Sequence, residues 1–312
     1  MSNLKYSVLP AAVAAVLALV AAPAAMATPT SPVFTIDPAL VAGVPQVPTG
    51  IPAPFQANAF AGTASQLLRS DVVNKTHQVN GWMQVSNFVL NNNPLNLFQT
   101  GLGNYYNLYI SFSLSDKWRA GDAAHPGAFN AAGSINDLTK LDVKFWADPQ
   151  RDNVFTNANS AGAGIDASLV GGANDILLAV GDLMVGTAGF NDNSGSLGAF
   201  LNATLNFAVC NGAGSADVGG KAATGNLGAL AGGCANNIGS SFFAQPKPFY
   251  DMMFNAFNNT TQGAVLNPAT GNVAINNAVG NLDFNSVPEP GTLALLGLGL
   301  FGIGATVRRR AA

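Results

Sequence analysis

Apolar and polar residues alternate with a period of two through much of the middle of this chain. The clearest case is segment 105–114, where Leu108, Ile110 and Phe112 alternate with tyrosine, asparagine and serine. Because successive side chains of a strand point to opposite faces, this pattern predicts a strand with one buried face. Other segments with strand character are 33–36, 79–90, 141–145, 175–185, 200–209, 273–275 and 282–284.

Segment 248–257 is the best helix candidate. Pro248 is suited to the first turn of a helix, and the large apolar residues then follow the spacing i, i+3, i+4 and i+7, at Tyr250, Met253, Phe254 and Phe257. The sequence therefore predicts one short helix among many strands.

Asparagine, glycine and aspartate separate the predicted strands, as turn residues do. Gly181 and Asp182 interrupt the apolar segment 175–185 and predict a turn there, whereas segment 60–73 has no clear period. Short strands joined by turns, with one helix, predict a mainly β fold, a single antiparallel β-sandwich of jelly-roll type spanning residues 28–286.

The N-terminus has the three parts of a secretory signal peptide. A short polar start with Lys5 precedes an apolar region over residues 8–22, and Ala25-Met26-Ala27 forms a small-residue cleavage site. We expect residues 1–27 to be removed on export, so that the mature chain begins at Thr28.

A second apolar run lies near the C-terminus. It extends from Gly291 to Val307 without a charge and is followed by Arg308, Arg309 and Arg310. Its 17 residues correspond to roughly 25 Å of helix, the short end of the range that spans a bilayer. By the positive-inside rule the arginines stay in the cytoplasm, so the sequence predicts a stop-transfer helix with the preceding chain exported.

Directly before this run stands Val287-Pro288-Glu289-Pro290, which contains the only glutamate of the chain. The motif, the apolar helix and the arginine cluster together (residues 287–312) resemble the PEP-CTERM sorting signal of Gram-negative exoproteins. The resemblance implies a transient inner-membrane anchor that exosortase cuts near the motif. It further implies that the released protein passes to the cell surface or extracellular matrix.

The exported part carries few charges. Charged residues make up 9% of the chain, against about a quarter in an average protein. Of the 13 basic residues, Lys5 and three arginines lie in the two terminal signals, as does one of the 16 acidic residues. The exported part is therefore near −6, which argues against nucleic acid or an anionic membrane surface as a partner, and its weak charge favours self-association.

Two cysteines, Cys210 and Cys234, bracket a loop rich in glycine and alanine. In an oxidising compartment a single pair is most simply a disulfide. Closing this loop would remove about 3 kcal/mol of unfolded-state entropy on the chain-entropy model. A catalytic cysteine is the alternative, but Lys221 is the only basic residue near either one.

Candidate catalytic and metal residues are sparse. The two histidines lie on separate polar segments, and none of G-x-S-x-G, H-E-x-x-H and C-x-x-C occurs. Asp148, Asp152 and Asn153 are weak candidates for Ca²⁺, which prefers oxygen ligands, but the same residue types also form turns. We predict no cofactor and no enzymatic activity; the alternative is a secreted polysaccharide hydrolase that uses two aspartates across a cleft.

Four short landmarks in the exported part resemble the flocculation-associated branch of PEP-CTERM proteins. They lie at residues 34–38, 145–149, 175–178 and 242–250. The resemblance implies a protein that promotes cell aggregation in a biofilm matrix, by binding exopolysaccharide or copies of itself. Candidate sugar-stacking residues are Trp82, Trp118 and Trp146, although a tryptophan packed in the core is the simpler interpretation of each.

Overall fold

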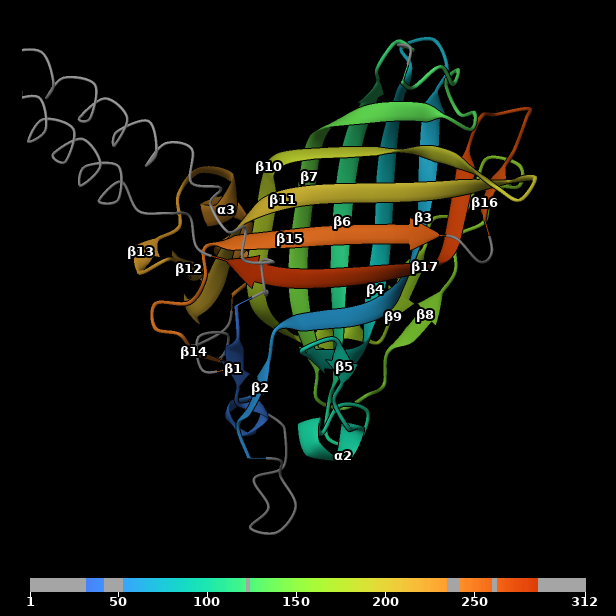
Figure 1. Cartoon of the computed structure of the whole chain (residues 1–312). Helices are drawn as coiled ribbons and strands as arrows, with labels where there is room; N and C mark the ends of the chain where they lie inside the picture. The colour runs from blue at the N-terminus through green and yellow to red at the C-terminus, as the bar shows by residue number, and fades with distance from the viewer. Residues whose placement is uncertain (1–31, 42–52, 122–123, 235–241, 260–262, 286–312) are drawn as a thin grey trace, which may run out of the picture. The chain divides into compact units, whose positions relative to one another are not determined.

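The computed structural model describes residues 32–41, 53–121, 124–234, 242–259 and 263–285, all within one compact unit that starts at Ser31. The fold is mainly β, as predicted (Figure 1). The signal peptide with Ala25 and Ala27, the motif residues Val287–Pro290, the apolar run and Arg308–Arg310 fall outside these ranges.

The long strands are β3 (Ala59–Asp71), β4 (Thr76–Leu90), β6 (Asn107–Trp118), β7 (Ser134–Asp148), β10 (Ile176–Asn193), β11 (Ser196–Gly212), β15 (Met252–Asn259) and β17 (Val273–Asn285). The short strands are β1 (Phe34–Ile36), β2 (Phe55–Ala57), β5 (Asn93–Pro94), β8 (Val154–Thr156), β9 (Ser168–Val170), β12 (Ser215–Val218), β13 (Lys221–Ala222), β14 (Phe243–Gln245) and β16 (Ala264–Leu266). The helical segments are α2 (Leu97–Thr100), α3 (Gly225–Leu230), η1 (Pro38–Leu40), η2 (Gly172–Asn174) and η3 (Ala231–Gly233).

The eight long strands form one closed antiparallel barrel rather than the predicted sandwich. Their order is β10-β7-β6-β4-β3-β17-β15-β11, and β11 pairs again with β10 (Figure 1). The β10–β11 pairing is continuous from Ala179↔Val209 to Asn193↔Ser196 apart from one bulge. A sandwich and a barrel share the same period of two, so the sequence pattern does not distinguish them.

Bulges and small residues let the long strands curl. Each of the pairings β3–β4, β3–β17, β6–β7 and β7–β10 contains a register shift, and a bulge increases local twist. Gly81 pairs with Phe112 across β4 and β6, and a Cβ at Gly81 would lie 2.5 Å from the Phe112 ring. The aromatic ring therefore fills the space that the missing side chain leaves.

The turn predicted at Gly181 and Asp182 is wrong, because β10 runs through both residues without a break. Gly181 occupies a crowded interior position, where a Cβ would lie 2.8 Å from Val143 Cγ2. Glycine at this position serves close packing between strands instead of chain reversal.

The helix predicted over residues 248–257 is also wrong. Residues 252–259 form β15, which pairs with β11 on one side and β17 on the other. Met253 and Phe257 point into the barrel, whereas Phe254 is half-buried on the outer face. Because Phe254 is apolar although it faces outward, the apolar residues of this strand follow the spacing of a helix rather than strict alternation.

One end of the barrel interior is filled by phenylalanines. Phe34 of β1 packs on Phe60 and Phe284, with ring centroids 5.4 Å and 5.1 Å apart. Phe207 of β11 lies 4.7 Å from Phe284. Further rings of this aromatic end are Phe55, Phe88, Phe145, Phe242, Phe243 and Phe249. The small sheet β14-β1-β2 thus closes this end with apolar side chains.

The interior toward the opposite end is polar. His77 is fully buried, and its Nδ1 and Nε2 each lie 2.7 Å from an oxygen, of Asp116 and of Asn130 respectively. The Asn130 amide nitrogen donates to the carbonyl of Gly271, which fixes its oxygen toward His77. Both ring nitrogens are therefore engaged in hydrogen bonds inside the barrel, one with Asp116 and one with Asn130. Phe129 stacks on the imidazole with ring centroids 4.8 Å apart.

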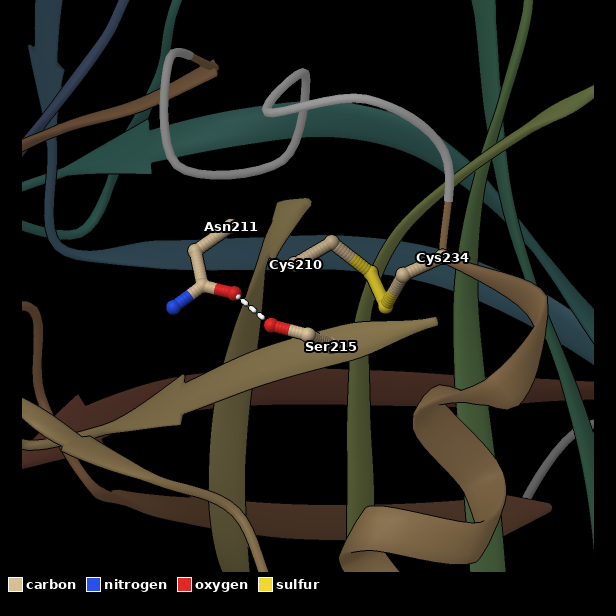
Figure 2. The surroundings of a disulfide bond; sticks show 4 residues. All are labelled: Cys210, Asn211, Ser215 and Cys234. Atoms are coloured by element: carbon tan, nitrogen blue, oxygen red, sulfur yellow. Dashed lines mark hydrogen bonds between the residues drawn. A yellow bond between two sulfur atoms is a disulfide. The ribbon is translucent and has the colours of Figure 1, made fainter. Parts of the chain in front are cut away.

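A small lobe held by the disulfide Cys210–Cys234 covers part of the outer face (Figure 2). Asn211 and Ser215 are hydrogen-bonded beside the disulfide, as Figure 2 shows. Although the loop is rich in glycine and alanine, it forms β12, β13, α3 and η3. Its Leu227 and Ala231 pack with Cys234 in a second core against β10 and β11. The disulfide closes this core at the base of the loop.

Replacement of His77 by leucine is expected to destabilise the barrel. The substitution leaves a buried oxygen of Asp116 without its hydrogen-bond partner, a change that costs about 1–3 kcal/mol. Urea unfolding of the wild type and His77→Leu should show this loss as a lower midpoint. The double variant His77→Leu/Asp116→Leu removes both polar partners and should recover part of it. A His77→Leu protein as stable as the wild type would contradict a stabilising role for this hydrogen bond.

Candidate ligand-binding groove

A concavity of the described surface crosses the outer face of the barrel. It has a volume of about 780 Å³ and runs across strands β10, β11, β15, β17, β3 and β4. Strand pairing places its lining side chains in two rows. One row contains Thr187, Asn202, Ala256 and Asn281, and the other Val185, Thr204, Phe254, Asp283, Ala59 and Val89.

The groove offers amide and hydroxyl groups together with one aromatic ring. Asn202 and Asn281 are exposed on either side of Ala256, whose small side chain leaves the floor open. Over the described ranges, the Asn202 and Asn281 amides form no side-chain hydrogen bond, so their donors and acceptors are available to a ligand. Phe254 is half-buried in the second row. Asp283 brings the only formal charge among the lining residues.

No local pattern in the sequence identifies the groove residues as a group. They come from six strands, and only the register of the folded sheet brings them into adjacent rows. Phe254 was the one available signal, as an apolar residue out of phase with the alternation of β15. The helical spacing of segment 248–257 instead predicts that Phe254 lies on one face of a helix.

The three tryptophans proposed as sugar platforms are packing residues. Trp82 is 8% exposed, donates to the carbonyl of Thr156 and contacts Phe155 of β8. Trp146 is half-buried, donates to Ser111 Oγ and stacks on Tyr109. Phe155, in the β8–β9 ribbon, thus belongs to the same outer group of aromatic rings as Trp82, Trp146 and Tyr109.

Trp118 is half-buried as well. Its indole N–H donates to the carbonyl of Gly127, and Lys75 Nζ lies 5.8 Å from its ring centroid. Protein groups thus already occupy both the polar edge and the surroundings of this ring.

The calcium candidates lie in a turn beside the β8–β9 ribbon. Asp148 is fully buried, and its two carboxylate oxygens accept the backbone N–H groups of Arg151 and Asn153. Asp152 accepts a hydrogen bond from Asn174 at 3.4 Å. In the part of the chain that the structure describes, no group of three or more His, Cys, Asp or Glu side chains is placed to hold a metal ion. Turn chemistry accounts for Asp148, which agrees with the alternative interpretation of these residues as turn formers.

Asp175 is the most perturbed carboxyl of this region. Its Oδ2 accepts the Tyr109 hydroxyl at 2.6 Å and the Asn153 amide at 2.8 Å, whereas its buried Oδ1 has no hydrogen-bond partner among the described residues. Burial raises the Asp175 pKa above its ordinary value of 3.8, and the neighbouring charges of Asp148 and Asp152 add to the rise. The two hydrogen bonds oppose it.

One pair of aspartates meets on the outer face, at the cross-strand position Asp142↔Asp182. The Asn226 amide of α3 donates to both carboxylates, at 2.8 Å and 3.3 Å. Asn206 binds the remaining oxygen of Asp182, and Lys140 that of Asp142. All four oxygens are therefore engaged, and the pair links α3 to the barrel.

Residues 286–310 match the family described as PEP-CTERM protein-sorting motif. No curated protein and no solved structure matches the chain. The match covers the sorting signal, with Val287–Pro290 and Arg308–Arg310, and none of the barrel. It supports an exported protein that exosortase processes. The resemblance of the barrel region to flocculation-associated proteins stays a prediction.

No helix within the described ranges is both long and apolar enough to cross a membrane. The apolar run that the sequence assigns to this function lies in the matched segment, beyond the last described residue.

Replacement of Asp175 by asparagine is expected to stabilise the protein at neutral pH. A raised folded-state pKa means that the folded protein holds the proton more tightly, so this carboxyl favours folding below about pH 3.8 and loses that contribution as the pH rises. Asparagine mimics the protonated form at every pH. Urea unfolding at several pH values should show Asp175→Asn above the wild type at pH 7, with the difference shrinking toward pH 4. A difference independent of pH would contradict the assignment.

Proposed function

We propose that this protein promotes cell aggregation in an extracellular matrix by binding an uncharged exopolysaccharide in the outer groove. The proposal rests on one observation. The groove, which crosses six strands, is lined both by the Asn202 and Asn281 amides, which form no side-chain hydrogen bond among the described residues, and by the ring of Phe254. Amides donate to and accept from sugar hydroxyls, and an aromatic face packs on the apolar face of a sugar ring. The groove is open along its length, which suits a polymer.

The charge of the groove favours a neutral chain. Asp283 would repel an anionic polysaccharide, and the exported part is itself near −6. We therefore assign the ligand to the class of neutral or weakly charged polysaccharides.

Self-association is the other route to aggregation that the composition favours. Closure of the barrel removes the edges of its eight long strands, which would otherwise offer backbone groups to a second copy. The sheet path ends in β13, which has two residues. This arrangement favours the polysaccharide over strand-to-strand assembly.

We propose that the protein has no enzymatic activity. The hydrolase alternative requires two aspartates across an open cleft. The groove is lined by Asp283 alone among the acidic residues, and the Asp142–Asp182 pair is enclosed by Lys140 and two asparagines.

Export and processing are tested by the intact mass of the protein from its host, with and without exosortase. With exosortase we expect an extracellular form that starts near Thr28 and ends near Pro288. Without it, the chain should keep its arginines and stay in the membrane fraction. An uncut, membrane-bound chain in both strains would contradict processing.

Obstruction of the groove is expected to abolish polysaccharide binding. Ala256→Trp places a bulky ring on the floor between Asn202 and Asn281, and we expect at least a tenfold loss of affinity, about 1.4 kcal/mol. The assay is affinity electrophoresis of the purified protein in gels that contain the host exopolysaccharide, alongside sedimentation of complemented cells.

Val279→Trp is the matched control, because Val279 is an exposed residue of β17 that does not line the groove. Equal binding by Ala256→Trp and Val279→Trp would show that the ligand does not occupy this site.

A further inference from the structure

The last strand of the barrel ends close to the membrane anchor. β17 ends at Asn285, and five residues separate it from Gly291, the first residue of the apolar run. Consecutive Cα atoms are at most about 3.8 Å apart, and six such steps span about 20 Å in an extended chain. While the anchor is uncut, this end of the barrel is therefore held within about 20 Å of the lipid.

Strand pairing places α2 at the same end. Asp283 of β17 pairs with Ala59 of β3, which pairs with Val89 of β4, and Val89 pairs with Pro94 of β5. Three steps between neighbouring strands amount to about 15 Å. The helix α2 begins three residues after Pro94, and Figure 1 shows it projecting from this end of the barrel.

α2 carries an exposed apolar tip. Phe98 is 81% exposed and Leu97 42% exposed. The turn is held rigidly, because Asn96 Oδ1 accepts the Phe98 N–H at 2.9 Å and Gly101 closes the helix in the left-handed conformation. The tip is thus presented in a fixed conformation without burial of its largest side chain.

An uncharged groove adjoins the tip. It has a volume of about 460 Å³, and its lining residues are Ala53, Pro54, Phe55, Gln56, Leu90, Leu95, Phe98 and Gln99. Arg151 lies near the C-terminal end of α2, because its guanidinium donates to the carbonyl of Gly103, three residues beyond Thr100, at 3.0 Å. A cation next to an apolar tip matches the phosphate and acyl layers of a lipid surface.

We propose that, before exosortase cleavage, the Leu97–Phe98 tip and its groove rest in the headgroup region of the inner membrane. The lipid surface is the occupant because the short tether holds this end against it. The inference rests on the membrane anchor that the proposed function includes. It adds a defined orientation of the barrel relative to the bilayer. The aromatic end faces the bilayer and the His77 end faces away.

The test uses the full-length chain reconstituted without exosortase into vesicles of phosphatidylethanolamine and phosphatidylglycerol. A fluorophore on Gln99→Cys reports on the tip, and one on Val73→Cys, 84% exposed in the turn between β3 and β4, reports on the far end. Lipids with a nitroxide on the headgroup quench a nearby fluorophore. We expect at least threefold stronger quenching at position 99 than at position 73.

Two serine substitutions separate lipid contact from mere proximity. Leu97→Ser/Phe98→Ser in the Gln99→Cys protein should lose most of the difference, whereas Val72→Ser at the far end should change nothing. Both tip residues are exposed, and an unchanged melting temperature would verify the fold. Equal quenching at the two positions, or quenching insensitive to the tip substitutions, would overturn the proposal.

Vesicle flotation distinguishes failure of this inference from failure of anchoring. Protein that does not float with the vesicles would contradict the anchor, and with it the docking that depends on it. Protein that floats but is unquenched at position 99 would contradict docking alone. Shielding of position 99 that requires added exosortase would assign the tip to the protease and overturn the lipid surface as occupant.

Discussion

Closure of the sheet by the pairing of β10 with β11 is the constraint on which the rest of this structure depends. Once the two strands pair, the inward side chains of all eight strands must fill one interior, and the outward side chains must form one continuous surface. Closure also places β10 beside β11, which extends the rows that β11, β15, β17, β3 and β4 form along the groove. The same closure leaves α3 and the disulfide lobe no position except on the outer face of β10 and β11.

The interior divides into two chemically different parts. Phenylalanines fill the end closed by β1, β2 and β14, where ring contacts add about 0.5–1.5 kcal/mol each beyond the area they bury. Toward the other end, His77 and Asp116 hold the loop that carries Phe129 and Asn130. An apolar core tolerates alternative packings, whereas directional hydrogen bonds between buried side chains define one arrangement. The polar part thus specifies how the β6–β7 loop closes the barrel.

Local patterns in the sequence predicted most of the eight long strands, because period-two alternation reports directly on which side chains are buried. β1, β4, β6, β7 and β11 each overlap a predicted segment, and segments 273–275 and 282–284 lie toward the two ends of β17. The errors have a common physical origin in residues whose environment is set by distant partners. Gly181 is small because Val143 approaches it, and Phe254 is apolar on an outward face because it lines the groove. The buried His77–Asp116 pair was equally invisible, because 39 residues separate its members.

The contact between Phe34 and Phe284 joins the beginning of the mature chain to its end, and this sets the order of events during export. β17 lies between β3 and β15 in the barrel, yet it is among the last parts of the exported chain to emerge from the membrane. The barrel therefore cannot close while the chain is still being translocated, and pairings of such high contact order form slowly. Residues 286–310, which match the sorting motif, directly follow β17, so the barrel closes only once the segment next to that motif is free to pair.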